Sequence, residues 1–171
     1  TVYSRRSASA AAPTAGLHLT EQVLETCRVV GARIESLELV VGLDTFRPIT
    51  VDDLDEHRMH REDYCVPATT LGACRDASRV IAVGTTTVRA LESAARSGLE
   101  GRTDLFIRPP FDFRVVDVLL TNFHQPRSSL LVMLEAFAGP RWRELYGTAL
   151  ADGYRFLSFG DAMLVGRAAT S

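Results

Sequence analysis

The sequence predicts an α/β fold for residues 1–171: a single domain whose mostly parallel, curled sheet forms part of a β/α barrel-like structure. The length suits one domain with a hydrophobic core of its own. Short apolar runs alternate with helical stretches along the chain, and this alternation is typical of parallel strands joined by crossover helices. The clearest unit is the buried run 79–84, which ends in a glycine and is followed by a helical stretch over 85–95.

The first third of the chain begins with a helical pattern. Apolar spacing predicts a helix over 17–30, with Thr20 as its N-cap and Gly31 as its stop. The run 34–41 predicts a strand. The acidic, polar stretch 51–63 predicts a loop or a short helix.

Later segments continue the alternation. A weak helix is predicted over 67–77, and the helix that begins at residue 85 is expected to end near Gly98. Residues 128–138 are apolar on nearly every side, as in a buried helix, and Pro140 starts another helix. Further strands are predicted over 105–107, 115–120 and 156–165.

The composition is that of an ordinary globular protein, with 46% hydrophobic and 23% charged residues and a net charge of −2. No apolar run reaches the roughly 18 residues of a membrane helix, so no membrane partner is expected. All 19 basic residues are arginine. The absence of lysine excludes Schiff-base chemistry, pyridoxal phosphate attachment and a Walker-type phosphate loop for this chain.

Two features bear on location and completeness. The cysteines Cys27, Cys65 and Cys74 form no C-x-x-C pair, which indicates a reducing compartment and predicts a cytoplasmic protein. The chain begins with TVY, without an initiator methionine, and these residues have the pattern of the end of a strand. We therefore expect it to be a piece of a longer protein.

Polar residues follow the buried run at Gly84. A parallel sheet binds ligands beyond the carboxyl ends of its strands, where helix N-termini present free N–H groups to anions. Thr85, Thr86 and, one turn along, Arg89 therefore form a candidate site for a carboxylate or phosphate. The alternative is a plain helix cap with hydroxyl side chains and, for Arg89, a structural ion pair with Glu92.

A second polar group follows the predicted strand over 115–120. Thr121, Asn122 and His124 precede a proline, and three different hydrogen-bonding groups at a strand end can orient a polar ligand. The alternative for His124 is a structural histidine that is hydrogen-bonded within the fold.

The stretch DEHRMHREDYC, residues 55–65, holds two histidines, several carboxylates and a thiol. His57 and His60 are three residues apart and Glu62 falls off their common helix face, whereas metalloprotease helices space their histidines by four. Cys65 starts an apolar segment and is expected to be buried. No metal site is therefore predicted, and a metal-dependent hydrolase built on these residues is kept as an outside alternative.

Seven short segments, taken together, resemble those of one protein family. The segments are AAPTAGLH (11–18), TFRP (45–48), HRMHRE (57–62), VGTTTVRALES (83–93), TNFH (121–124), AFAG (136–139) and YRFLSFGDAM (154–163). They occur in the same order in the S-adenosylmethionine:tRNA ribosyltransferase-isomerases of queuosine biosynthesis, and the resemblance runs along the whole chain.

The resemblance implies an activity and its partners. The enzyme transfers and isomerises the ribosyl moiety of S-adenosylmethionine onto 7-aminomethyl-7-deazaguanine at the wobble position of tRNA, giving epoxyqueuosine and releasing adenine and methionine. No metal and no cofactor beyond S-adenosylmethionine as co-substrate are implied. The partners are S-adenosylmethionine, tRNA carrying the modified wobble guanine, and a missing N-terminal half. This chain is then the C-terminal portion of a longer two-domain enzyme.

The resemblance also implies roles for single residues. The reaction needs a base to remove a proton beside the sulfonium and an acid to assist the departure of adenine. The implied catalytic residues are His60, Glu62 and His124. The implied substrate-binding residues are His18, His57, Thr85, Thr86, Arg89, Thr121, Asn122 and Asp161, with the methionine carboxylate as the anion at Thr85, Thr86 and Arg89.

The chain departs from the family pattern at three places. Val40 replaces a histidine, and Asp44 and Pro110 each replace a glycine. A divergent member that is catalytically inactive, or that uses another acceptor, is therefore kept as the alternative function.

Overall fold

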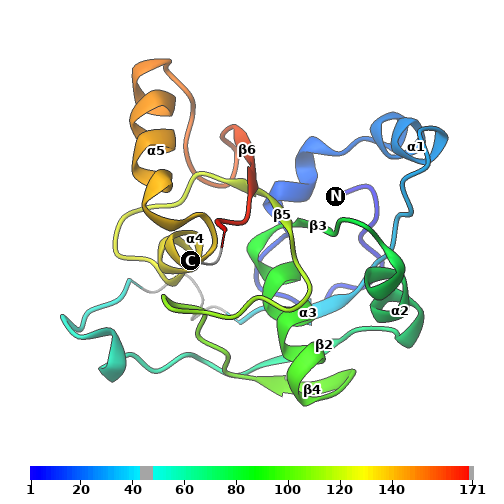
Figure 1. Ribbon diagram of the computed structural model, residues 1–171, viewed down its shortest axis with the longest axis horizontal. Helices are drawn as coiled ribbons and strands as arrows, with labels where there is room; N and C mark the ends of the chain where they lie inside the picture. The colour runs from blue at the N-terminus through cyan, green and yellow to red at the C-terminus, as the bar shows by residue number, and fades with distance from the viewer. Residues whose placement is uncertain (43–47, 170–171) are drawn as a thin grey trace.

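The computed structural model describes residues 1–42 and 48–169 (Figure 1). The helices are η1 (Thr14–His18), α1 (Glu21–Val29), η3 (Leu54–Glu56), α2 (Ala68–Asp76), α3 (Thr85–Ser97), α4 (Ser129–Ala138), η4 (Gly139–Arg141) and α5 (Trp142–Ala151). The strands are β1 (Glu38–Val40), β2 (Glu62–Cys65), β3 (Ile81–Val83), β4 (Glu100–Thr103), β5 (Val118–Asn122) and β6 (Ala162–Gly166).

These strands form two small sheets and not one curled sheet. Sheet A has the order β1-β2-β4, and both of its pairings are antiparallel. Sheet B has the order β3-β5-β6, in which β5 runs parallel to β3 and antiparallel to β6. The prediction of a mostly parallel sheet is therefore wrong for the described strands. Neither three-stranded sheet closes into a barrel within the described part of the chain.

The reason lies in the connections. α3 follows β3, but the next strand, β4, pairs with β2 in sheet A and not with β3. β5 then lies beside β3, and β6 returns along the other edge of β5 in the opposite direction. Alternation along the sequence does not specify such pairings, because they depend on contacts between distant segments.

Local patterns located the helices better than the strands. α1 begins after Thr20, whose side chain accepts a hydrogen bond from the Val23 N–H at 3.2 Å, although the helix is shorter than predicted. β2 and β4 are absent from the sequence-based prediction because their residues are mostly polar. The predicted strand over 105–107 is not a strand in the structure.

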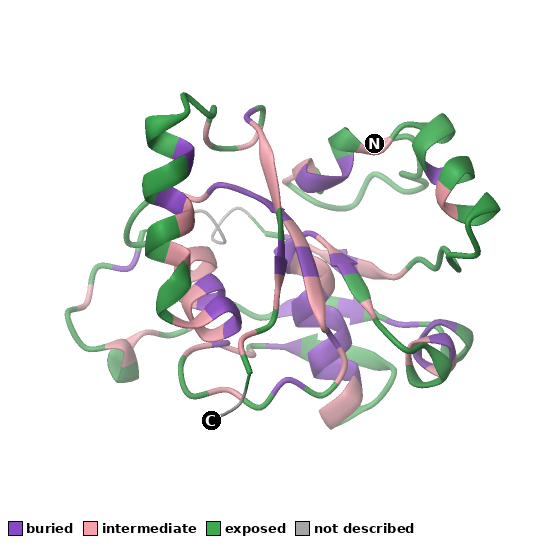
Figure 2. Ribbon diagram, turned by 45° about the horizontal axis from the view of Figure 1, so that its top comes forward, coloured by how far each residue is buried: buried purple, intermediate pink, exposed green. Residues whose placement is uncertain are grey.

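The central helix, α3, contacts strands of both sheets (Figure 1). Its side chains Val88, Ala90 and Leu91 are buried in the core. Figure 2 shows the buried residues gathered on this helix and the strands around it, whereas α1 and α5 display largely exposed faces. The two sheets are therefore held together mainly through α3.

A buried carboxylate fastens the segment before β5 to α3. Glu92 is fully buried and accepts hydrogen bonds from the backbone N–H groups of Arg114, Val115 and Val116 at 3.0, 3.0 and 3.2 Å. It also pairs with Arg96 at 2.5 Å. Glu92 is therefore not the ion-pair partner of Arg89, which corrects the structural alternative considered for that arginine.

Sheet B is covered on one face only. Ala82, Leu119 and Val165 point into the core and are at most 2% exposed. On the other face Ile81 is 51% and Leu164 65% exposed. The second face of sheet B is thus an open apolar surface.

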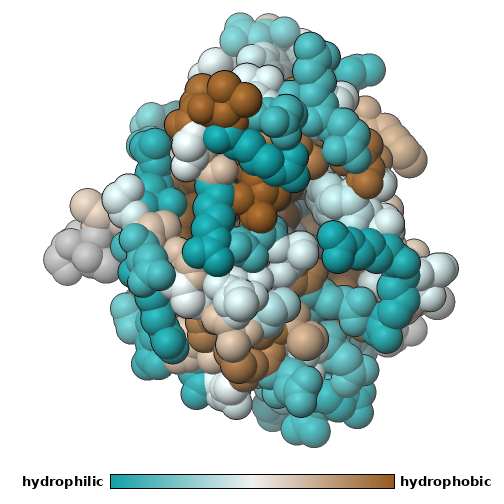
Figure 3. All heavy atoms as spheres, turned by 90° about the vertical axis from the view of Figure 1, so that its right-hand side faces the viewer, coloured by the Kyte–Doolittle hydropathy of each residue, from teal (hydrophilic) through white to brown (hydrophobic). Residues whose placement is uncertain are grey.

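The outer surface of the molecule is otherwise mixed. The side that carries α1 and α2 is largely hydrophilic and is interrupted by separate apolar patches (Figure 3). No helix within residues 1–42 and 48–169 has both the length and the apolar content that a bilayer crossing requires.

The three departures from the family pattern fall in different places. Val40 is in β1, where it pairs with Asp63 of β2. Pro110 follows Pro109 through a cis peptide bond. Asp44, together with residues 45–47 of the TFRP segment, lies outside the described residues.

Candidate active site

The carboxyl end of β3 turns directly into α3 at Gly84. Gly84 has a φ of 89°, a conformation that favours glycine, and its N–H donates to the Leu120 carbonyl at 2.8 Å. Gly84 is itself the N-cap residue, so no side chain caps the helix, and Thr85 and Thr86 follow it. The turn therefore places the first N–H groups of α3, which lack intrahelical partners, at the end of sheet B.

Asn122, at the carboxyl end of the neighbouring strand, is the centre of a polar cluster. Its Oδ1 accepts from Thr14 Oγ1 at 3.1 Å, and its Nδ2 donates to the Asp161 carbonyl at 3.3 Å. The same Nδ2 lies 3.3 Å from His18 Nε2. Because an amide nitrogen only donates, this contact requires the His18 tautomer that is protonated at Nδ1. We call Thr14, His18, Asn122 and Asp161 the Asn122 cluster.

The Asn122 cluster lies beside the Gly84 turn. η1, which carries Thr14 and His18, packs so closely that a Cβ added to Gly84 would lie 3.9 Å from Ala15 Cβ. η1 also contacts β5. Three segments that are distant in the sequence therefore meet at the end of sheet B.

Asp161 is held in a closed loop that precedes β6. Its carboxylate accepts from the Arg155 N–H at 2.7 Å, and its own N–H donates to the Arg155 carbonyl at 2.7 Å. The backbone hydrogen bond from Arg155 lowers the pKa of this carboxyl, and the charge of the Arg155 side chain lowers it further. Asp161 is therefore ionised at neutral pH, within the electrostatic reach of His18.

His124 occupies a partly buried position just beyond β5. Its Nε2 lies 2.9 Å from Thr121 Oγ1, and its backbone N–H donates to the Tyr146 hydroxyl at 2.7 Å. Burial lowers the pKa of His124 to about 4 and raises the pKa of Tyr146 to about 12. At neutral pH the imidazole is therefore uncharged and able to accept a proton.

Glu62 and Arg89 meet in the interior, between β2 and α3. Their side chains are 2% and 4% exposed, and Arg89 Nη1 donates to Glu62 Oε2. Arg89 Nε donates to the Leu105 carbonyl at 3.3 Å, and Nη2 is buried without a hydrogen-bond partner among the described residues. The guanidinium of Arg89 is thus engaged with sheet A and the segment after it.

His57 and His60 precede β2 on a separate segment. The His57 ring lies 5.0 Å from the Phe106 ring, centroid to centroid. Burial lowers the pKa of His57, and the charge of His60 lowers it further. Cys65 is exposed and not buried as expected, because residues of β2 alternate between the core and solvent. Within the described ranges no three His, Cys, Asp or Glu side chains are arranged to hold a metal ion.

The predicted residues therefore fall into three groups with different surroundings. His18, Asn122 and Asp161 meet beside the Gly84 turn that precedes Thr85 and Thr86. Thr121 and His124 meet at the carboxyl end of β5. Glu62 and Arg89 pair in the interior, and His57 and His60 lie on the segment before β2. Two partners, Thr14 and Tyr146, were missed from the sequence. Thr14 lies within the AAPTAGLH segment and could have been found there, whereas Tyr146 lies in none of the seven segments and in no polar group at a strand end.

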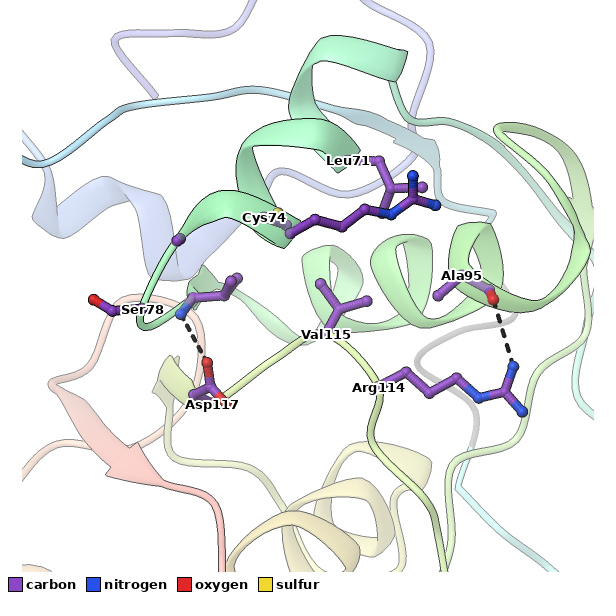
Figure 4. Close-up of a pocket in the computed structure, with 10 residues that line it drawn as sticks. Leu71, Cys74, Ser78, Ala95, Arg114, Val115 and Asp117 are labelled. Carbon is purple, nitrogen blue, oxygen red and sulfur yellow. Dashed lines mark hydrogen bonds between the residues drawn. The ribbon is translucent and has the colours of Figure 1, made fainter.

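A separate cavity of about 500 Å³ lies at the opposite end of sheet B (Figure 4). Val80, just before β3, and Asp117, just before β5, both line it, and the Val80 N–H donates to Asp117 Oδ2 at 2.9 Å. Arg114 also lines it and donates to the Ala95 carbonyl at 3.5 Å. The cavity is at the amino ends of the parallel strands and is distinct from the Asn122 cluster.

Comparisons with known proteins agree with the resemblance seen in the sequence. The family model described as "Queuosine biosynthesis protein" matches residues 1–165. A curated relative from Rubrobacter xylanophilus named S-adenosylmethionine:tRNA ribosyltransferase-isomerase is 55% identical over 96% of this chain and 50% of its own length. A relative of the same name from Thermus thermophilus is 53% identical, again over 96% of this chain and 50% of its own length.

A solved structure of a relative is similar to most of this chain. The crystal structure of S-adenosylmethionine tRNA ribosyltransferase from Thermotoga maritima matches with a TM-score of 0.72 and 43% identity, over 88% of this chain and 50% of that one. The chain spans about half the length of the curated relatives it matches. The chain belongs to the queuosine biosynthesis protein family.

Proposed function

We propose that the protein containing this chain transfers and isomerises the ribosyl moiety of S-adenosylmethionine onto 7-aminomethyl-7-deazaguanine at the tRNA wobble position. Epoxyqueuosine forms, adenine and methionine leave, and S-adenosylmethionine is the only co-substrate. The observation that carries this proposal is the identity of 53–55% with relatives that bear the name of this activity, over 96% of the chain. A tRNA acceptor implies that the reaction takes place in the cytoplasm.

The end of sheet B supplies groups suited to this reaction. His124 is oriented by Thr121 and is uncharged at pH 7, and it serves as the base that removes the proton beside the sulfonium. This role requires the pKa of His124 to rise from about 4 towards neutrality in the substrate complex, because a base works best when its pKa is close to the operating pH. His18, in the uncharged tautomer that the contact with Asn122 requires, helps to hold the ribose next to the ionised Asp161, and His60 serves as the acid that assists the departure of adenine. Asn122 orients the ribose hydroxyls.

The methionine carboxylate binds at the Gly84 turn. The first N–H groups of α3 lack intrahelical partners there, and the helix dipole favours a negative charge by roughly 0.3–1 kcal/mol. Thr85 and Thr86 add hydroxyl donors next to these N–H groups.

Glu62 and Arg89 support the site from the other side. Their buried ion pair holds β2 against α3. It thereby helps to position His57 and His60, which lie on the segment immediately before β2. His57 takes part in holding the substrate, and His60 is the acid.

The remaining half of the protein completes the site. The relatives are about twice as long as this chain, and the open apolar face of sheet B around Leu164 needs a cover. Single exposed apolar side chains are common, but a contiguous apolar sheet face in a folded protein marks an interface. We assign this face to the N-terminal half of the same protein.

The decisive experiment uses the complete protein with S-adenosylmethionine and tRNA that carries 7-aminomethyl-7-deazaguanine at the wobble position. Release of adenine and conversion of the base, both followed by chromatography and mass spectrometry, are expected only when both substrates are present. The control is the same tRNA with an unmodified guanine. Binding of S-adenosylmethionine without adenine release in either reaction would show a divergent member that is inactive or uses another acceptor, as the departures at Val40, Asp44 and Pro110 allow.

A further inference from the structure

The loop between α5 and β6 carries an aromatic side chain that the fold does not use. Phe159 is 86% exposed, more than any other large apolar side chain in the described part of the chain. Its neighbours in the loop behave differently: the Phe156 ring packs on Phe123 with the centroids 4.8 Å apart, and Tyr154 packs on Phe123 at 5.9 Å. Phe159 makes no such ring contact among the described residues.

Phe159 is nevertheless held in place. The Gly160 N–H donates to the Leu157 carbonyl at 3.0 Å, and the Leu157 N–H donates to the Phe123 carbonyl at 3.0 Å. A Cβ on Gly160 would come within 2.2 Å of the Arg155 carbonyl oxygen, so the loop is wound as tightly as glycine permits. The exposed ring thus projects from a loop that is closed on both sides by hydrogen bonds.

Its position links it to the Asn122 cluster. Phe159 stands two residues before Asp161, whose carbonyl accepts from Asn122 and whose carboxylate lies near His18. An exposed aromatic face next to several hydrogen-bonding groups suits a ligand that has a flat aromatic surface and polar edges. A nucleobase has both features, and stacking of a base on an aromatic side chain tolerates any base identity.

We propose that Phe159 is a stacking platform for a nucleobase beside the Asn122 cluster. This inference rests on the proposed function, which offers two sources of such a base: the adenine of S-adenosylmethionine and a base of the tRNA. The shared chemistry is a π surface that covers the exposed ring while the polar edges of the base reach the cluster.

The test measures binding by the complete protein in two separate arms, S-adenosylmethionine alone and tRNA alone. Phe159→Ala is expected to weaken one of the two affinities about fivefold to about a hundredfold, the range known for loss of base stacking. Phe159→Leu, which keeps an apolar side chain without a ring, should be equally impaired. Phe159→Tyr should restore binding, because the stacking face is retained. The arm that responds identifies the source of the base.

Melting temperatures separate stacking from packing against another part of the protein. If Phe159→Ala and Phe159→Leu lower the melting temperature while both affinities stay at the wild-type level, the residue packs inside the complete protein and the stacking platform is refuted. Phe159→Leu with wild-type affinity in both arms refutes it as well.

The outcome for the proposed function is read independently from adenine release by the wild-type protein. No adenine release, together with a Phe159-dependent affinity in one arm, would reject the transferase activity and keep the platform. Normal adenine release, together with affinities that do not depend on Phe159, would keep the transferase activity and reject the stacking platform. Absence of binding in both arms for the wild-type protein would reject both.

Discussion

Arg89 and Glu62 form an ion pair in which both side chains are almost completely buried, at 4% and 2% exposure. From the sequence, Arg89 is expected to reach a substrate carboxylate, so that its removal would weaken substrate binding and leave stability unchanged. The structure supports a different expectation, because a buried charge that loses its partner strongly destabilises the folded state.

Arg89→Ala should therefore lower the free energy of unfolding by about 3–5 kcal/mol, as is typical when a buried ion pair loses one member. The matched control is Arg61→Ala, since Arg61 pairs with Asp104 at 3.3 Å with both side chains more than 60% exposed. That variant should change stability by about 0–1 kcal/mol. Chemical denaturation measures the free energy of unfolding of both variants. Equal stabilities of the two variants would contradict the role assigned to the Arg89–Glu62 pair.

His124 should make stability depend on pH. Burial lowers its pKa from 6.5 to about 4, so the unfolded chain binds this proton more readily than the folded one. The contribution of His124 to stability is complete above about pH 6.5 and is lost as the pH falls towards about 4, which amounts to about 3 kcal/mol. Urea unfolding measures the free energy of unfolding at pH 7 and at pH 4.5. Between these two pH values the wild-type protein should lose more stability than His124→Gln, and the difference between the two losses should be most of the contribution of about 3 kcal/mol. Parallel losses in the two proteins would show that His124 titrates normally.

Asn122 should control activity through the geometry of its cluster. Its amide joins η1 to the loop that holds Asp161, with contacts of 3.1 and 3.3 Å to Thr14 and to the Asp161 carbonyl. Asn122→Ala should lower kcat/KM for adenine release about tenfold to about a hundredfold, as expected when hydrogen bonds worth about 1–3 kcal/mol are removed. Gln125→Ala, an exposed neighbour on the same segment, is the control and should retain full activity. An unchanged kcat/KM for Asn122→Ala would show that the Asn122 cluster is not part of the active site.

Leu164 should behave as a buried residue in the complete protein. Leu164 on sheet B and Leu150 on α5 are 65% and 66% exposed in this chain, so the pair forms a matched test. If the N-terminal half covers sheet B, Leu164→Ala in the complete protein should cost about 2–5 kcal/mol, as for a buried leucine, and Leu150→Ala far less. Differential scanning calorimetry compares the two melting temperatures. An equally small shift in melting temperature for both variants would show that the N-terminal half does not cover this face of sheet B.

Features that depend on neighbouring residues can be predicted from the amino-acid sequence alone. Thr20 and Gly31 bracket α1, and Gly84 and Gly98 bracket α3, because caps and stops are set by contacts across one or two turns of helix. The family was also determined by the sequence, since seven ordered segments specify it without any coordinates. The polar residues at Asn122 were located for the same reason, as they directly follow an apolar run.

The direction of the strands and the partners of the polar side chains became visible in the three-dimensional structure and could not be predicted from local patterns. β2 is too polar to be predicted as a strand, yet it pairs with β1 and β4 and determines that sheet A is antiparallel. Thr14 reaches Asn122 across 108 residues and Arg89 reaches Glu62 across 27. Such contacts depend on which distant segments the core brings together, and a pattern with a period of two or of 3.6 residues carries no information about them.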